Sequence, residues 1–287
     1  MRKGSRRIVL ATLIASIAIG MLTACGSGKV EASAENSTPE KNVRVIKAAT
    51  SAIPRPFTYQ DENNELTGHN IELIKAVFDR LPQYKLEIET TEFQSIFVGI
   101  DSGIYQLGVN NIAKNPEREE KYLYTDAEMK NHYIVVTNSE IKYDENGDLS
   151  QLAGKKYIGP AGNDKTTIVE KYNDENSDSQ IEIEYTDADI QQYFEAVESG
   201  KADFFIMDEP VYKGYYAKEF NFQVNVARLD NIKSAAYSYF IVGKQDTQLA
   251  EDINKALKEV IADGTSKKIS EKYLGDDYSP YDYEKEK

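Results

Sequence analysis

Two stretches of the chain repeat one pattern at a constant offset of 97 residues. In each, an apolar helical pattern is stopped by a Ser-Gly pair, and an apolar strand then ends in polar side chains. The first stretch runs from Phe97 to Asn111 and the second from Phe194 to Asp208. Because ligands bind beyond the carboxyl ends of strands in open parallel sheets, the repeat predicts two lobes of similar plan that offer polar groups to a shared cleft. The alternative is a short chance match, since Ser-Gly is a common way to end a helix.

Strand and helix patterns alternate along the rest of the chain. Val43–Ile46 has the composition of a strand, whereas apolar side chains from Ile71 to Leu81 recur at helical spacing, with Asn70 as the expected N-cap. Such alternation predicts an α/β fold with parallel strands. The last helical pattern stops at Gly275, and residues 276–287 are expected to fray.

The N-terminal segment has the features of an export signal. Four basic residues among the first seven precede an apolar stretch from Ile8 to Leu22 that is too short to cross a bilayer comfortably. Leu22-Thr23-Ala24-Cys25 follows and resembles the lipobox of bacterial lipoproteins, which is cleaved before the cysteine that then carries the lipid. An ordinary signal peptide with a chance cysteine is the alternative. We therefore expect residues 1–24 to be a signal peptide and residues 25–42, which have hardly an aliphatic side chain, to be a flexible lipidated tether.

The net charge of the chain limits the kinds of partner that it can bind. The chain has 34 basic and 48 acidic residues, a net charge of −14, and residues 1–24 contain four of the basic and none of the acidic ones, so their removal leaves −18. A chain of this charge is repelled by nucleic acid and by anionic lipid head groups, and we expect no nucleic-acid partner. Cys25 is the only cysteine, so no intramolecular disulfide is possible.

Signals of catalysis are weak. The two histidines, His69 and His132, do not have the spacing of zinc ligands, and the chain contains no nucleophile elbow, Walker loop or GxGxxG motif. We expect no catalytic residue, no cofactor and no metal.

The segment around Pro116 has features of a binding site, because Pro116 favours a short helix whose N–H groups could face an anion. Arg118 then offers a planar set of donors to a carboxylate, although it could also form a surface salt bridge. Asp208 could bind a ligand or cap the segment after it.

Four stretches of the chain resemble the polar amino-acid-binding proteins that feed ABC importers, and the resemblance covers Val43 to Gly275. The stretches are Pro56 to Leu73, Phe93 to Gly103, Asn115 to Tyr124, and Ile253 to Gly275. Within them, the Asn-Asn pair before Ile-Ala-Lys-Asn and the Lys-Tyr-Leu-Tyr run after the arginine look most like the cystine-binding subgroup. The resemblance implies the two-lobe, type II periplasmic-binding-protein-like fold, in which each lobe is a mostly parallel sheet flanked by helices. We expect lobe 1 at residues 43–131 and 235–287, lobe 2 at residues 132–234, and a hinge where the chain crosses twice.

The resemblance also implies roles for residues in the cleft. In this family the arginine of the Pro-Glu-Arg motif, here Arg118, holds the α-carboxylate of the ligand, and the acid after the lobe 2 strand, here Asp208, holds the α-amine. An aromatic ring flanks the ligand, the end of the lobe 1 strand contacts it with backbone groups, and a Gly-rich turn of lobe 2 closes on the carboxylate. The expected ligand-binding residues are Ser51, Phe57, Phe93, Asn110, Asn111, Ala113, Arg118, Asn163 and Asp208. Relatives often have Gly and Thr at the positions of Asn111 and Ala113, so a hydroxyl contact is lost here.

These observations predict a solute-binding lipoprotein on the outer face of the bacterial cytoplasmic membrane. It would act as a monomer, capture an amino acid and deliver it to an ABC permease and its ATPase. The ligand expected is L-cystine, because several neutral amides surround the cleft and no spare lysine is evident for an acidic side chain. One alternative is an enzyme like the cyclohexadienyl dehydratases, with Glu209 as the only nearby free acid. Another is a receptor subunit that reports its ligand to a signalling partner.

Overall fold

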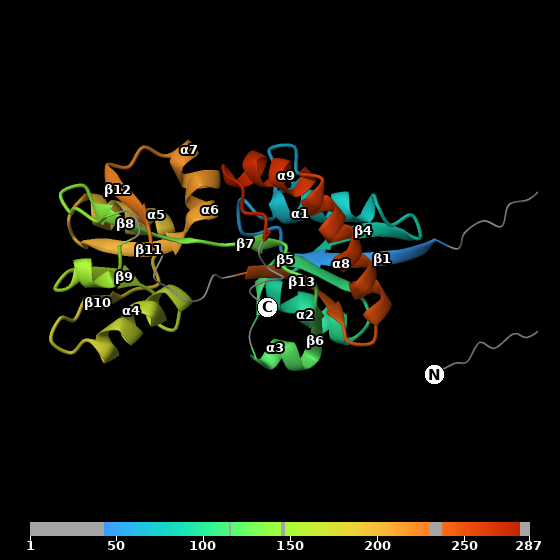
Figure 1. The fold of residues 1–287 in the computed structure, drawn as a ribbon, viewed down its shortest axis with the longest axis horizontal. Helices are drawn as coiled ribbons and strands as arrows, with labels where there is room; N and C mark the ends of the chain where they lie inside the picture. Colours follow the sequence, from blue (N-terminus) through green and yellow to red (C-terminus); the bar gives the residue numbers. More distant parts are fainter. Residues whose placement is uncertain (1–42, 115, 145–146, 230–236, 282–287) are drawn as a thin grey trace, which may run out of the picture. The chain divides into compact units, whose positions relative to one another are not determined.

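The described part of the chain is built on two separate β-sheets (Figure 1). The computed structural model describes residues 43–114, 116–144, 147–229 and 237–281. The predicted signal peptide, Cys25 and the predicted tether lie outside the described residues. Among the described helices, none is both long and apolar enough to cross a membrane.

The first sheet has the strand order β4-β1-β5-β13-β6, with β7 paired to β13. Strand β1 pairs in parallel with β4 and β5, whereas β13 runs antiparallel to β5, β6 and β7. Because β13 comes from the C-terminal part of the chain, the first sheet joins two distant segments. Its strands are β1 (Arg44–Thr50), β4 (Tyr84–Thr90), β5 (Leu107–Ala113), β6 (Tyr122–Tyr124), β7 (Met129–Lys130) and β13 (Tyr237–Gly243).

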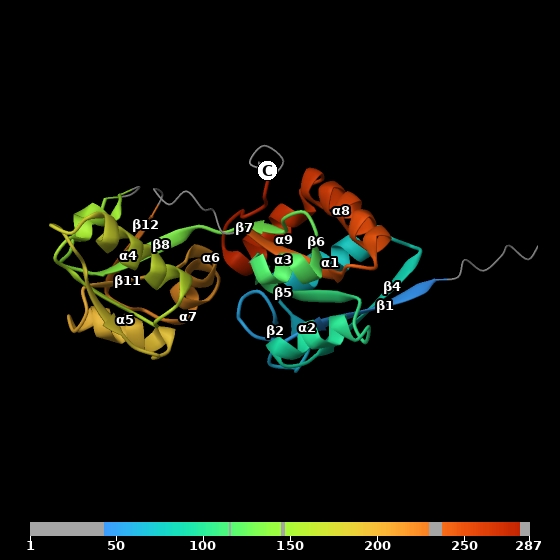
Figure 2. The ribbon, with the colours of Figure 1, turned by 90° about the horizontal axis from the view of Figure 1, so that it is seen from below.

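Helices cover both faces of the first sheet, as Figures 1 and 2 show. Side chains of β1 alternate between the faces: Ile46 and Ala48 belong to one buried cluster with α1 (His69–Phe78) and α8 (Thr247–Ala262), and Ala49 belongs to another with α2 (Phe93–Asp101). The apolar residues along one side of α8 are buried. Burial of one large apolar side chain stabilises the fold by roughly 1.5–3 kcal/mol. This packing holds the carboxyl end of β5 in place.

The second sheet has the strand order β10-β9-β11-β8-β12. Strand β9 pairs in parallel with β10 and β11, and β8 runs antiparallel to β11 and β12. Its core is rich in aromatic rings, including those of Tyr157, Phe194 and Phe205. Its elements are β8 (Tyr133–Asn138), the 3₁₀ turn η1 (Leu149–Leu152), β9 (Lys156–Gly159), α4 (Asp164–Glu175), β10 (Glu182–Tyr185), α5 (Ile190–Glu198), β11 (Phe204–Asp208) and β12 (Val224–Arg228).

The repeat predicted from the sequence is a repeat of structure. Helices α2 and α5 begin at Phe93 and Ile190, and strands β5 and β11 begin at Leu107 and Phe204, so both pairs keep the offset of 97 residues. Each helix is followed by a serine and then a glycine. The φ angle is 76° at Gly103 and 73° at Gly200, a backbone conformation that is strained for residues with a side chain. The predicted fold class is confirmed. The expectation of mostly parallel sheets holds for only one side of each sheet, because β8 and β13 run antiparallel to the strands beside them.

The remaining elements are short or lie near the C-terminus. They are the hairpin of β2 (Tyr59–Gln60) and β3 (Leu66–Thr67), then α3 (Pro116–Lys121), α6 (Glu209–Val211), the π-helical turn η2 (Tyr212–Tyr216), α7 (Ala217–Glu219) and α9 (Thr265–Leu274). Chain crossings between the sheets fall between β7 and β8 and between β12 and β13. The lobe boundaries and the hinge stay predictions.

Two local predictions were wrong. Helix α1 is capped by Gly68 and not by Asn70, which is buried in the first turn. Gly68 has a φ of 120°, and a Cβ there would lie 2.3 Å from the carbonyl oxygen of Phe57, so only glycine fits. The segment from Asp276 to Tyr281 does not fray: Tyr278 is buried, and its carbonyl accepts a hydrogen bond of 2.8 Å from the backbone N–H of Lys130. Residues 282–287 lie outside the described residues.

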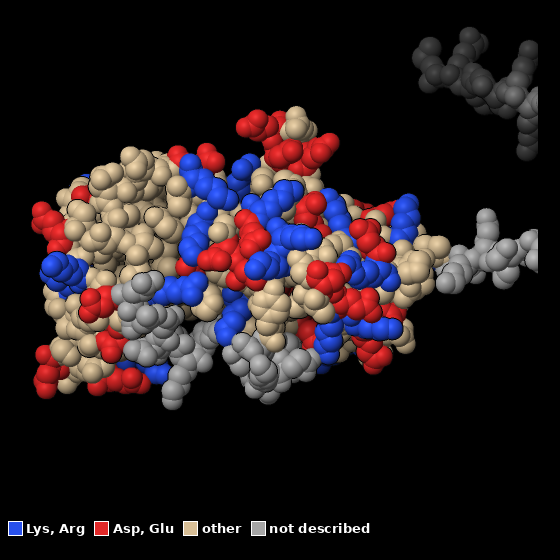
Figure 3. Space-filling model, turned by 45° about the horizontal axis from the view of Figure 1, so that its top comes forward, with Lys and Arg blue, Asp and Glu red and all other residues tan. Residues whose placement is uncertain are grey.

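Charges are distributed widely over the surface. Figure 3 shows basic and acidic side chains interspersed on the viewed face, beside one broad area without either. Several of these charges form exposed pairs, such as Lys75 with Glu72 at 3.0 Å. Such pairs contribute about 0–1 kcal/mol each, so the fold depends on its buried clusters.

Candidate ligand-binding site

Arg118 is held against two aromatic rings beside the end of β5. Its guanidinium carbon lies 4.7 Å from the centroid of Phe97 and 5.6 Å from that of Phe93. Its Nη1 donates a 3.4 Å hydrogen bond to the carbonyl of Ala113. The two rings meet edge to face, with centroids 5.2 Å apart. The structure thus brings together Phe93, Ala113 and Arg118, and the planar cation is fixed by stacking while its donors remain suited to a carboxylate.

Asn110 organises the loop that follows β1. Its buried Oδ1 accepts hydrogen bonds from the hydroxyls of Thr50 (3.0 Å) and Thr58 (3.3 Å), and from the backbone N–H and hydroxyl of Ser51, both at 2.8 Å. The side-chain oxygen of Asn110 is therefore occupied, and it positions Ser51 beside the end of β5.

Asn111 occupies a strained backbone position. Its φ is 51°, in the left-handed region where asparagine is tolerated better than most residues other than glycine. That conformation gives a physical reason for the glycine that relatives often have here. The side-chain Oδ1 of Asn111 is buried and has no hydrogen-bond partner among the described residues. An unpaired buried acceptor is unfavourable, so a donor from a ligand would stabilise it.

Phe57 lies in a buried cluster. Its side chain is 2% exposed and packs with Met129, Tyr273, Leu274 and Tyr278. This cluster joins the loop after β1 to the C-terminal segment, and the contact of Phe57 with a ligand stays a prediction.

Asp208 ends β11 and is paired with a lysine. Its Oδ2 lies 2.8 Å from the Nζ of Lys165, and its Oδ1 accepts a hydrogen bond from the side chain of Asn131. The side chains of Lys165 and Asp208 are 17% and 25% exposed, so both reach solvent. Asp208 makes no side-chain capping bond to α6, which removes the capping alternative. This carboxylate is positioned by its neighbours to receive a cation.

Lys165 was missed by the sequence reasoning. Its Nζ also lies 3.1 Å from Asp164 and 5.1 Å from the ring centroid of Tyr133, whose hydroxyl donates a 2.9 Å hydrogen bond to Asp164. Burial lowers the pKa of Lys165, but Asp208 and Asp164 raise it by more, so the net direction is upward and the ammonium stays charged. The expectation that no spare lysine is evident did not consider Lys165, which two aspartates already hold. Its position in the sequence was the available signal, because it directly follows the Gly-rich turn Ala161-Gly162-Asn163-Asp164.

Asn163 caps helix α4. Its Oδ1 accepts a 2.9 Å hydrogen bond from the backbone N–H of Lys165, as an N-cap residue does. The Asn163 side chain is therefore used in starting the helix, and α4 directs the positive end of its dipole toward this turn. A ligand carboxylate at the turn would interact favourably with that end.

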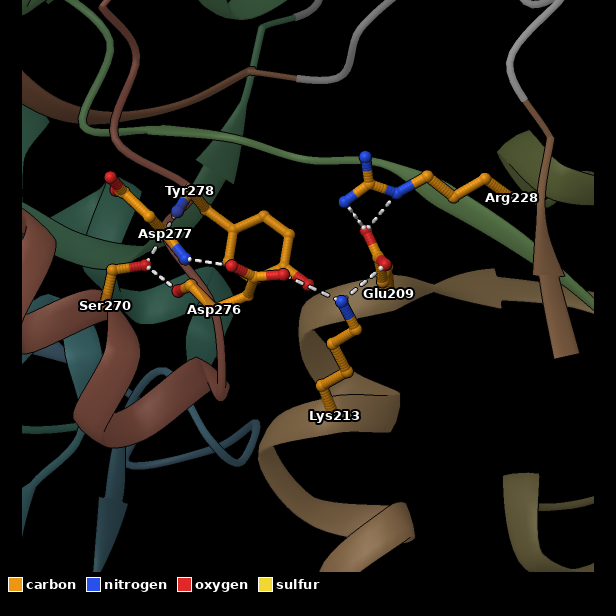
Figure 4. Close-up of polar contacts among 7 residues, drawn as sticks. All are labelled: Glu209, Lys213, Arg228, Ser270, Asp276, Asp277 and Tyr278. Carbon is orange, nitrogen blue, oxygen red and sulfur yellow. Dashed lines mark hydrogen bonds and ion pairs between the residues drawn. The ribbon is translucent and has the colours of Figure 1, made fainter. Parts of the chain in front are cut away.

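Glu209 is not a free acid (Figure 4). Its side chain is 5% exposed and accepts hydrogen bonds from Nε of Arg228 at 2.9 Å, while Nζ of Lys213 lies 3.0 Å away. Lys213 also lies 2.8 Å from Asp276 in the C-terminal segment, and this contact holds the pKa of the Asp276 carboxyl below its ordinary value. Because two cations hold Glu209, it is poorly placed to act as a general acid or base.

The two strands that correspond in the repeat thus end in opposite charges. Near the end of β5 lies the Arg118 guanidinium, and at the end of β11 lies the Asp208 carboxylate. Together with two sheets of matching plan, these groups define the class of type II periplasmic-binding-protein-like folds that bind a solute carrying both charges. Comparison with known proteins places the chain within that class.

The chain belongs to family 3 of the bacterial extracellular solute-binding proteins, whose family model matches residues 46–276. This confirms the resemblance inferred from the sequence motifs. Among curated relatives, the chain is 31% identical to the L-cystine-binding protein TcyK of Bacillus subtilis (strain 168), over 92% of this chain and 95% of that protein.

Solved structures agree with the assignment. The crystal structure of ytmK from Bacillus subtilis, described as a probable amino-acid ABC transporter extracellular-binding protein, superposes with a TM-score of 0.72 at 30% identity, over 82% of this chain and 100% of that one. A structure from work on glutathione import via GshT and the cystine ABC importer TcyBC of Streptococcus mutans has a TM-score of 0.65 at 30% identity, over 85% and 99%.

Proposed function

We propose that this protein is a lipid-anchored, extracytoplasmic solute-binding protein that captures L-cystine and delivers it to an ABC importer. One observation carries the amino-acid part of the proposal. Arg118 and Asp208 supply opposite charges at the ends of two corresponding strands. An α-amino acid has both charges, and burial of either without a partner costs several kcal/mol.

The two charges also suggest how binding is coupled to delivery. Arg118 belongs to the predicted lobe 1 and Asp208 to the predicted lobe 2. A ligand that pairs with both interacts better with a closed arrangement than with an open one, and this difference is what drives closure. The ABC permease would then recognise the closed, loaded form.

Cystine is favoured by sequence relatives and by the polar groups at the site. TcyK binds L-cystine and shares 31% of residues with this chain. Fewer amide groups can accept from a ligand than the sequence suggested, because the side-chain oxygens of Asn110 and Asn163 accept hydrogen bonds within the protein. Asn111 keeps an unpaired buried oxygen, and a second amino-acid end on the ligand could donate to it, whereas leucine could not.

The anchor is proposed from the Leu22-Thr23-Ala24-Cys25 motif. Acylation of Cys25 would keep the protein at the outer face of the cytoplasmic membrane, since each buried methylene contributes roughly 0.8 kcal/mol. The protein would face the cell surface in a Gram-positive source and the periplasm in a Gram-negative one.

Calorimetric titration of the purified protein with single amino acids tests the proposal. We expect saturable binding of L-cystine at least tenfold tighter than that of alanine or leucine. Equal or tighter binding of leucine would refute the ligand while leaving solute binding intact. An assay of prephenate and arogenate turnover tests the enzymatic alternative, and we expect none because Glu209 is held by Lys213 and Arg228.

A further inference from the structure

The ammonium of Lys165 lies where the amine of the ligand is expected. It is 2.8 Å from Asp208, the residue proposed to hold the α-amine. Both side chains belong to the second sheet and the helix that follows β9, so their contact does not depend on how the two sheets are arranged. A ligand amine that binds Asp208 must therefore share this carboxylate with Lys165 or displace it.

The charges around Lys165 sum to one excess negative charge, which leaves room for one more cation. Asp164 and Asp208 carry two negative charges against the single positive charge of Lys165. An α-ammonium bound at Asp208 would balance that excess. Because the ligand amine would take over part of the pairing with Asp208, the ammonium of Lys165 could then bind an anion beside that amine.

The position of Lys165 is unfavourable unless an anion faces it. The residue lies in the first turn of α4, where the helix dipole repels a cation. Its side chain is 17% exposed, so part of its hydration is lost. The two aspartates offset these terms in the free protein, and a ligand carboxylate would do so in the complex.

We propose that Lys165 recognises a second carboxylate on the ligand, so that the site selects amino acids with two acid ends and rejects those with a cationic side chain. This proposal rests on the proposed function and names its substrate class: two amino-acid ends joined through their side chains. Lys114 is the rival lysine, because it follows β5 and lies 4.6 Å from the ring centroid of Tyr239. Its side chain is 35% exposed, and its ammonium lies 3.9 Å from Glu119, whereas Lys165 lies 2.8 Å from Asp208, so the geometry favours Lys165.

Two ligands that differ only in the far carboxylate test this selection. They are L-cystine and the mixed disulfide of L-cysteine with cysteamine, which keeps the far amine and lacks the far acid. Calorimetry at pH 7 would measure both dissociation constants for the wild type and for Lys165→Met. The wild type is expected to prefer cystine at least tenfold, and Lys165→Met is expected to lose most of that preference.

Four further variants make the result specific. Lys165→Arg keeps the charge and should keep the preference, and Lys165→Gln is a second neutral variant if the methionine disturbs folding. Lys171→Met is the matched control, because Lys171 lies on the same helix with a side chain that is 74% exposed, and it should leave both constants unchanged. An unchanged preference in both neutral Lys165 variants overturns the proposal, as does an equal loss for both ligands, or a loss of preference in Lys114→Met alone. If the wild type binds neither disulfide, the proposed function fails as well.

Discussion

Glu128 gives a prediction whose size follows from the structure. Its carboxyl group is fully buried next to Asn70 and Ser238, and neither of its oxygens has a hydrogen bond of normal geometry among the described residues. Burial raises the pKa of Glu128 to about 8, although the Asn70 amide and the Ser238 hydroxyl partly oppose the shift. The carboxyl is therefore protonated in the folded protein at neutral pH.

The sign of the pH dependence follows from proton binding. Between pH 4.5 and pH 8 the folded protein keeps a proton that the unfolded chain has lost, so the free energy of unfolding falls as the pH rises through this window. One pKa unit corresponds to about 1.4 kcal/mol, so at pH 7 the group destabilises the fold by about 3 kcal/mol relative to pH 4. Glu128→Gln removes the titration, because a neutral amide has nearly the shape of the protonated acid.

Urea unfolding of the wild type and Glu128→Gln from pH 4.5 to pH 8 measures this effect. We expect the variant to become more stable than the wild type as the pH rises, by up to about 3 kcal/mol at pH 7. Glu251→Gln, an exposed position on α8, controls for the loss of one negative charge. Parallel pH profiles for the wild type and Glu128→Gln would refute the reasoning, and destabilisation by glutamine at pH 7 would mean that Glu128 is charged and paired.

Substitutions at three further residues test the site and the anchor. Arg118→Ala should weaken ligand binding by about 2–5 kcal/mol, because a buried carboxylate loses its charged partner, and Arg118→Lys should also weaken it. Dissociation constants within twofold of wild type for both variants in calorimetry would make Arg118 a mere surface residue. Arg80→Ala is the control, because the Arg80 side chain pairs with Asp263. Asp208→Asn should keep the fold yet abolish compaction on addition of cystine in X-ray scattering, whereas normal compaction would remove Asp208 from the clamp. Cys25→Ser should abolish palmitate labelling and release the protein from membranes, and unchanged fractionation would contradict lipidation.

Much of the fold could be predicted because its signals are local. The helical spacing of apolar residues, the Ser-Gly stops and the short apolar strands each depend on neighbouring positions, and the offset between Phe97 and Phe194 identified corresponding elements. Pairing direction was harder to predict. Whether β8 and β13 run parallel or antiparallel depends on where the chain crosses between the sheets, which no local pattern encodes.

Part of the candidate site could be predicted by residue type and position alone. Arg118 and Phe93 are adjacent in space, although their sequence separation gives no sign of the stacking between them. The surroundings of Phe57 could not be predicted, because an aromatic residue in a loop can face a ligand or a core, and only the tertiary structure shows that it packs with Tyr278. Lys165 was missed because its partner Asp208 is far along the chain.

The sequence by itself determined that the chain alternates strands and helices, that two segments repeat one plan, and that an arginine and an acid follow corresponding strands. These are properties of short segments, because they depend on the periodicity of apolar residues and on the residues that stop helices. Only the tertiary structure decided which charges pair: Glu209 is held by Lys213 and Arg228, and Asp208 is held by Lys165. Ion pairing and burial depend on distances between residues far apart in the chain, and those distances exist only after the sheets and helices have packed.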